Sequence, residues 1–162
     1  MWMRRSIGLV VGLAALVVAR STSAQTATQV VHFRVDPVNQ LAVSGNPAPL
    51  VVSAAIAGAA PTSVSASTST YAISTNESNQ KIVASLDQSL PLGLGLHVQL
   101  AAPAGATSRG SVALATAAAD VVTGISSTAS SALAITYSLD ASHIAGVTSA
   151  TRTVTYTIVA GT

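Results

Sequence analysis

Large apolar residues alternate with threonines near the C-terminal end of the chain, at residues 152–159. Val154, Tyr156 and Ile158 occupy every second position, and threonines fill the positions around them. Side chains of a β-strand point alternately to its two faces, and threonine favours extended backbone while tolerating water. The segment is therefore predicted to be a strand with one buried face and one threonine-covered face.

Weaker versions of this alternation recur along the chain, separated by turn signals such as Asp36-Pro37 and Ser44-Gly45-Asn46-Pro47. Residues 69–75 and 81–86 flank a turn at 76–79, which predicts a hairpin. The same turn matches the pattern of a glycosylation site, Asn76-Glu77-Ser78, but we interpret these residues as those of an ordinary turn. We expect strands at residues 27–36, 41–43, 50–55, 69–75, 81–86, 96–100, 111–116, 133–139 and 152–159, with small residues at 58–67 as a connection.

These segments predict an all-β fold of about eight or nine short strands. Their spacing and the absence of a long helical pattern favour an antiparallel two-sheet sandwich, immunoglobulin-like in architecture, with a closed barrel as the alternative. The alanine-rich residues 113–125 have no clean period, and the pattern leaves open whether they form a strand or a helical turn.

The first 24 residues predict a secretory signal peptide. Arg4 and Arg5 precede an apolar run at residues 7–19, which is shorter than the roughly 20 residues of a spanning helix. Small residues up to Ala24 predict cleavage before Gln25, leaving 25–162 as a single β-sandwich domain. We expect a secreted protein, extracellular or at the cell surface, with no membrane insertion after cleavage. The sequence leaves open whether the Sec or the twin-arginine route exports it.

Cleavage changes the charge balance. The chain has seven Lys and Arg residues, of which Arg4, Arg5 and Arg20 leave with the leader, so four cations face five anions and the net charge becomes −1. Proteins that bind nucleic acid need a concentrated basic surface, so nucleic acid is excluded as a partner. The chain has no cysteine, so packing and hydrogen bonds alone must hold the domain.

The histidines suggest no metal centre. His32 and His97 fall on the predicted solvent faces of their strands, and His143 follows Asp140 in a turn. Asp140 and His143 would supply only half of a metal site, which needs three or four ligands. We interpret the pair as a solvated turn and expect no bound metal or cofactor.

No motif predicts catalysis. The nucleophile motif G-x-S-x-G is missing, and Gly93-Leu94-Gly95 lacks the third glycine of a phosphate-binding loop. The five acidic residues are scattered, which argues against the paired carboxylates of a glycosidase. We assign no catalytic residues and predict that the chain is not an enzyme.

The aromatic residues give no sign of a sugar-binding platform. Trp2 lies in the leader, while Phe33, Tyr71, Tyr137 and Tyr156 each share a strand face with large aliphatic residues. All four are therefore predicted to lie in the core. Binding of a sugar or a host-surface ligand through loops stays open.

A resemblance to known proteins rests on the leader and three segments. These read Thr28-Gln-Val-Val-His-Phe-Arg-Val, Asn39-Gln-Leu-Ala-Val-Ser-Gly45 and Ala150-Thr-Arg-Thr-Val-Thr-Tyr-Thr-Ile158. Together they resemble small secreted bacterial β-sandwich proteins of uncharacterised function, loosely similar to fimbrial or pilus subunits. The resemblance implies a structural subunit of an extracellular fibre, pilus or surface matrix, with other copies of itself as partners. The alternative is a monomeric secreted or surface-attached module that binds a surface or a carbohydrate.

The first strand of the predicted domain, residues 27–36, is the candidate for assembly. Val31, Phe33 and Val35 form a regular apolar ridge on it, beside the free end that cleavage would create. The simpler expectation is that this strand is the first of its own sandwich. The alternative is that it adds to a sheet edge of a neighbouring copy.

Overall fold

The computed structural model describes residues 24–162 and separates them into two units, residues 24–34 and residues 35–162. The predicted leader lies outside the described residues, apart from Ala24. The described residues contain nine strands and no helix, so none of them forms a helix with the length and apolarity to cross a membrane.

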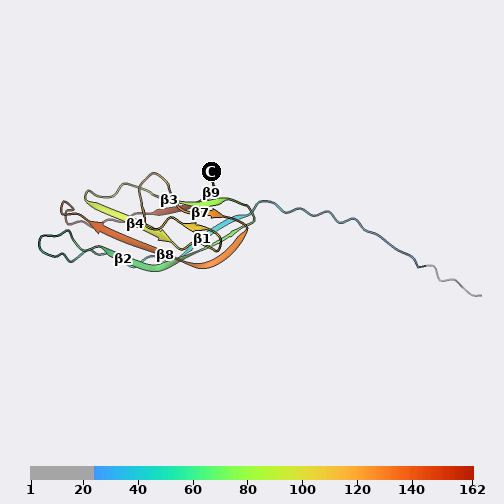
Figure 1. Ribbon diagram of the computed structural model, residues 1–162, viewed down its shortest axis with the longest axis horizontal. Helices are drawn as coiled ribbons and strands as arrows, with labels where there is room; N and C mark the ends of the chain where they lie inside the picture. The colour runs from blue at the N-terminus through green and yellow to red at the C-terminus, as the bar shows by residue number, and fades with distance from the viewer. Residues whose placement is uncertain (1–23) are drawn as a thin grey trace, which may run out of the picture. The chain divides into compact units, whose positions relative to one another are not determined.

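The strands of residues 35–162 form two antiparallel sheets, which Figure 1 shows as two layers. The sheets do not close into a barrel, so the predicted two-sheet sandwich is confirmed and the alternative is wrong. The five-stranded sheet has the order β1 (Asn39–Ser44), β2 (Val64–Thr75), β8 (Thr128–Ala141), β4 (Leu94–Leu100) and β6 (Val112–Ala113). The four-stranded sheet has the order β5 (Thr107–Ser108), β7 (Ala119–Ile125), β3 (Gln80–Leu86) and β9 (Val154–Ala160).

The core lies between the sheets and follows the period-two pattern of the sequence. On β3, buried Ile82, Ala84 and Leu86 alternate with partly exposed residues. Each large aliphatic side chain buried in this way contributes about 1.5–3 kcal/mol to folding. The other buried apolar residues come from β2, β4, β7, β8 and the segment after β6: Tyr71, Ile73, Val98, Leu100, Leu114, Val121, Val122, Ile125, Ile135 and Tyr137.

Three tyrosine hydroxyls are satisfied inside the sandwich. Tyr137 of β8 and Tyr156 of β9 are hydrogen-bonded to each other at 2.7 Å, which links the two sheets. Tyr71 of β2 donates its hydroxyl to the carbonyl oxygen of Ala101. Burial raises the pKa of Tyr71 to about 12. Burial also raises the pKa of Tyr156, and the hydrogen bond with Tyr137 acts in the same direction.

The predicted hairpin of residues 69–75 and 81–86 is wrong, although both segments are strands. They belong to different sheets, β2 pairing with β1 and β8, and β3 pairing with β7 and β9. The turn at 76–79 carries the chain from one layer to the other, with Asn79 at a φ of 52°. Both strands can then bury their apolar faces against each other across the core, which a flat hairpin would not allow.

Two other expected strands are shortened or lost. Residues 50–55 form only an isolated bridge between Ala55 and Pro61, in a stretch where prolines remove backbone donors. Residues 111–116 retain only the two residues of β6, and residues 64–67, expected to be a connection, begin β2. Residues 119–125, which the sequence left open, form strand β7 and no helical turn.

Candidate assembly site

The segment at residues 27–35 carries an apolar ridge without any secondary structure. Val31, Phe33 and Val35 are 70, 91 and 80% exposed, and none of the residues 24–38 belongs to a strand. The expectation that residues 27–36 form the first strand of their own sandwich is therefore wrong in this structure, as is the placement of Phe33 in the core. A strand needs a partner for its backbone N–H and C=O groups, and this segment has no ladder here.

The side chain of Asn76 fixes the chain where the segment meets the sandwich. Its Oδ1 accepts the N–H of Val38 at 2.8 Å, and its Nδ2 donates to the carbonyl oxygen of Asp36 at 2.9 Å. The N–H of Asn76 donates in turn to the carbonyl oxygen of Val38 at 3.2 Å. Because the side-chain amide of Asn76 is hydrogen-bonded to the backbone, these contacts support the interpretation of Asn76-Glu77-Ser78 as an ordinary turn. The same hydrogen bonds hold the chain from Asp36 onward at the end of β2.

Strand β9 confirms the face pattern predicted for residues 152–159. Val154, Tyr156 and Ile158 are partly buried and pack against the core, whereas Thr155 and Thr157 are exposed. β9 is the last strand of its sheet, pairing with β3 on one side. Within residues 24–162, no strand pairs with its other side.

The hydrogen bonds at the ends of β9 show which backbone groups face this free side. Asp87 donates its N–H to Thr153, and Gly161 donates its N–H to Asn79. In an antiparallel ladder, hydrogen-bonded residues alternate with residues whose N–H and C=O point the other way. Residues 153, 155, 157, 159 and 161 therefore bond to β3, and Val154, Tyr156, Ile158 and Ala160 direct their backbone groups to the free edge.

Strand β1 borders the same side of the sandwich, at the edge of the five-stranded sheet, and lies next to β9. Leu41 and Val43 pair with the buried residues Ile73 and Tyr71, so their side chains point to the inner face. Leu41 is partly buried, but Val43 is 48% exposed. The inner face of the sandwich is thus incompletely covered between β1 and β9.

The histidine that lies against Asp140 is His97, whereas His143 is exposed in the turn that follows β8. His97 of β4 and Asp140 of β8 lie diagonally across two neighbouring strands, with 3.0 Å between Nδ1 and Oδ2 but without hydrogen-bond geometry. Gly95 pairs with Asp140 and lies beside the imidazole, and a Cβ at this position would only contact the ring, at 3.4 Å. Both side chains are substantially exposed, so the pair contributes at most about 1 kcal/mol.

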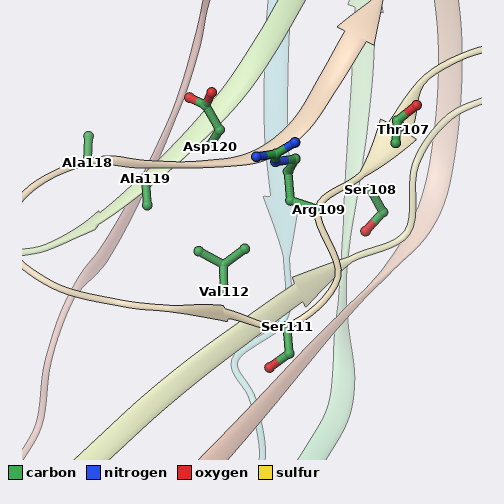
Figure 2. A pocket seen from close by; sticks show the side chains of 8 residues that line it. All are labelled: Thr107, Ser108, Arg109, Ser111, Val112, Ala118, Ala119 and Asp120. Atoms are coloured by element: carbon green, nitrogen blue, oxygen red, sulfur yellow. The ribbon is translucent and has the colours of Figure 1, made fainter.

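A depression of about 680 Å³ lies beside the short strands β5 and β6 (Figure 2). Asp120 stands at its rim and forms an ion pair with Lys81 of β3, with 3.1 Å between Nζ and Oδ1. Figure 2 shows the guanidinium of Arg109 turned toward the same rim. The lining combines one acid and one guanidinium with small residues: Thr107, Ser108, Arg109, Ser111, Val112, Ala118, Ala119 and Asp120. Within residues 24–162, no three metal-ligating side chains come together.

Comparison of the chain with protein-family models, with curated proteins and with solved structures found no significant match. The geometry described above is therefore the basis for inferring a function. It singles out the exposed ridge of Val31, Phe33 and Val35, whose period-two spacing the sequence predicted, and the free edge of β9, which the sequence did not predict. The free edge of β9 could be found only from the order of the strands in the sheet. The alternation of residues in β9 would be the same in a central strand and in an edge strand.

Proposed function

We propose that the chain is a non-enzymatic structural subunit of an extracellular fibre, pilus or surface matrix, whose copies assemble through residues 27–35. The observation that carries the proposal is the exposed apolar ridge of Val31, Phe33 and Val35, on a segment that pairs with no strand of residues 24–162. Exposed apolar side chains arranged with strand periodicity are typical of a segment that becomes a strand on binding. The predicted leader supports an extracellular location.

The division of the chain supports this role. All nine strands of the described residues lie between Asn39 and Ala160, and the core residues come from that range. Residues 27–35 can therefore leave or join a partner without removing a strand from their own sandwich. An interface between such a segment and a different surface of the next copy is heterologous, and its repetition gives an open filament.

The test compares matched variants of the secreted chain, beginning at Gln25, by sedimentation velocity at rising concentration and by electron microscopy. The unmodified chain should form long polymers as its concentration rises. The variant V31S/F33S, which removes the ridge, should remain a folded monomer. The control V30S/H32S changes the opposite face of the same segment and should still polymerise.

A compact monomer at all concentrations, together with producing cells whose surface fibres lack the chain, would overturn the proposal. The chain would then belong with the second class, monomeric adhesive or carbohydrate-binding modules. Equal polymerisation of V31S/F33S and of the unmodified chain would also contradict it, because assembly would then not use the ridge.

A further inference from the structure

The depression beside β5 and β6 lies along the side of the sandwich away from β1 and β9. β5 ends the four-stranded sheet and β6 ends the five-stranded sheet, whereas β9 and β1 are the opposite ends of those sheets. The depression has a volume of about 680 Å³, within the range of about 300–1,000 Å³ that is typical of small-molecule sites. Such sites are mostly apolar, whereas this lining is mostly small and polar, which favours a hydrophilic ligand.

Backbone hydrogen bonds hold Arg109 in place at the rim of the depression. Its N–H donates to the carbonyl oxygen of Val121 at 2.9 Å. The hydroxyl of Ser108 accepts the N–H of Gly110 at 3.2 Å and donates to the carbonyl oxygen of Leu100 at 2.6 Å. The guanidinium itself, turned toward the rim in Figure 2, has no ion pair or hydrogen bond with another group of residues 24–162. The fold therefore positions a cation that is available to a ligand.

The charges around the depression leave one positive charge uncompensated. Among the described residues, Arg109 and Asp120 are the charged ones of the lining. Asp120 is paired with Lys81, whose Nζ lies 3.1 Å from Oδ1 and 3.3 Å from Oδ2, so the charge of Arg109 remains. A ligand with a single negative charge would balance it. A carboxylate has that charge and accepts two parallel N–H bonds from a guanidinium, whereas a phosphate monoester carries a charge closer to two.

The side chains around the guanidinium can bind hydroxyl groups. Thr107 and Ser111 line the depression with hydroxyls that have no hydrogen bond to another part of residues 24–162. Asp120 is 38% exposed in its side chain and can accept a further hydrogen bond beside its ion pair with Lys81. Val112, in the middle of the side chains in Figure 2, offers a small apolar surface to the C–H groups of a ring. The arrangement fits a sugar ring that carries both hydroxyls and a carboxylate.

We propose that this depression binds a uronic acid unit of an acidic polysaccharide. The carboxylate of the sugar accepts hydrogen bonds from the guanidinium of Arg109. The ring hydroxyls bond to the hydroxyls of Thr107 and Ser111 and to the carboxylate of Asp120. A depression open to solvent admits a unit from the middle of a polymer, which an enclosed cavity would not. The site goes beyond the proposed function, because it lies within one chain and needs no contact between copies.

An NMR titration of the folded monomer tests the proposal. The reference chain is the variant V31S/F33S, so that polymers of the protein do not obscure the result. The probe is trigalacturonate, and the matched probes are the neutral trisaccharide of galactose, which has only the hydroxyls, and acetate, which has only the carboxylate. We expect trigalacturonate to shift the amide signals of residues 107–112 and 118–120 to saturation. Each matched probe should bind at least about tenfold more weakly, because it makes only part of the contacts.

Three variants of the reference chain test the residues of the site. R109Q should weaken the binding of trigalacturonate at least about tenfold, because it removes the charged hydrogen bonds to the carboxylate. The control R34Q removes the same charge from a residue outside the lining and should bind like the reference chain. A118F places a ring at an exposed position of the lining, so it should fill the depression and prevent binding without a change of charge. Thermal unfolding checks that each variant is folded.

Each contrary outcome overturns a stated part of the proposal. If no saturable shifts occur at residues 107–112 and 118–120, or if R109Q binds as tightly as the reference chain, the site is overturned. Equal binding of acetate would overturn the assignment to a sugar, because the site would then accept a carboxylate from any source, such as the C-terminus of a peptide. Equal binding of the neutral trisaccharide would overturn the assignment to an acidic polysaccharide.

Discussion

Replacement of Phe33 by alanine should weaken assembly without weakening the fold. The ring of Phe33 is 91% exposed in the single chain, so its loss should change the free energy of unfolding by no more than about 0.5 kcal/mol. In the proposed assembly the ring is buried against a neighbouring copy, and burial of a phenylalanine contributes about 1.5–3 kcal/mol. Since about 1.4 kcal/mol corresponds to tenfold in an equilibrium constant, F33A should raise the critical concentration for polymerisation about ten- to a hundredfold.

The assay measures two quantities on the same samples. Sedimentation at a series of concentrations gives the critical concentration, and thermal unfolding of dilute monomer gives its stability. H32A is the matched control, because His32 is a neighbour on the opposite face of the segment and should leave both quantities unchanged. An F33A monomer destabilised by more than about 1 kcal/mol would show that the ring packs within its own domain, and an unchanged critical concentration would show that the ring is not buried on assembly.

Three further predictions concern the sandwich itself. The stability that Tyr71 contributes should be fully present below pH 10 and should be lost as the pH rises toward 12, by up to about 3 kcal/mol, because burial raises its pKa to about 12. Urea unfolding at a series of alkaline pH values measures this loss of stability, which should be smaller in Y71F by the contribution of Tyr71, while the contributions of Tyr137 and Tyr156 remain. Gly93→Ala should lower the free energy of unfolding by about 1–3 kcal/mol more than Gly105→Ala does, as measured by thermal unfolding. Both glycines have a φ of +82°, but only at Gly93 would the new Cβ contact backbone atoms, at 2.6 Å. Equal losses of stability in the two variants would contradict this reasoning. Ile82→Ala should lower the free energy of unfolding by about 2–5 kcal/mol in urea titrations, whereas Ile56→Ala, at a side chain 75% exposed, should change it by less than about 0.5 kcal/mol.

The parts of the fold that the sequence predicted are those where one residue in two is large and apolar. β9 is an example, because its threonines mark the outer face and Val154, Tyr156 and Ile158 mark the inner face. β7 could not be predicted in this way. Its neighbours Val121 and Val122 are both fully buried, because the register between β3 and β7 shifts around Ile82 and interrupts the alternation.

The local sequence pattern could not predict which strands pair with each other. The turn at 76–79 has the residues of a hairpin turn, but it connects two layers, and only the long-range packing of β2 and β3 across the core determines this. The same holds for the candidate site. The ridge of Val31, Phe33 and Val35 is visible in the sequence. Its lack of a strand partner within residues 24–162 and the free edge of β9 depend on the order of the strands in the sheets.

In the proposed fibre, the hydroxyl pair of Tyr137 and Tyr156 would affect how the molecule transmits tension. A pull along β9 acts on the ladder to β3 in shear, because the hydrogen bonds of an antiparallel pair lie perpendicular to the strands. All the bonds of that ladder must then yield together. The 2.7 Å bond between the tyrosines connects β9 to β8 as well, so part of the tension passes into the second sheet. A strand tied to both layers can resist extension in a domain that has no disulfide to reinforce it.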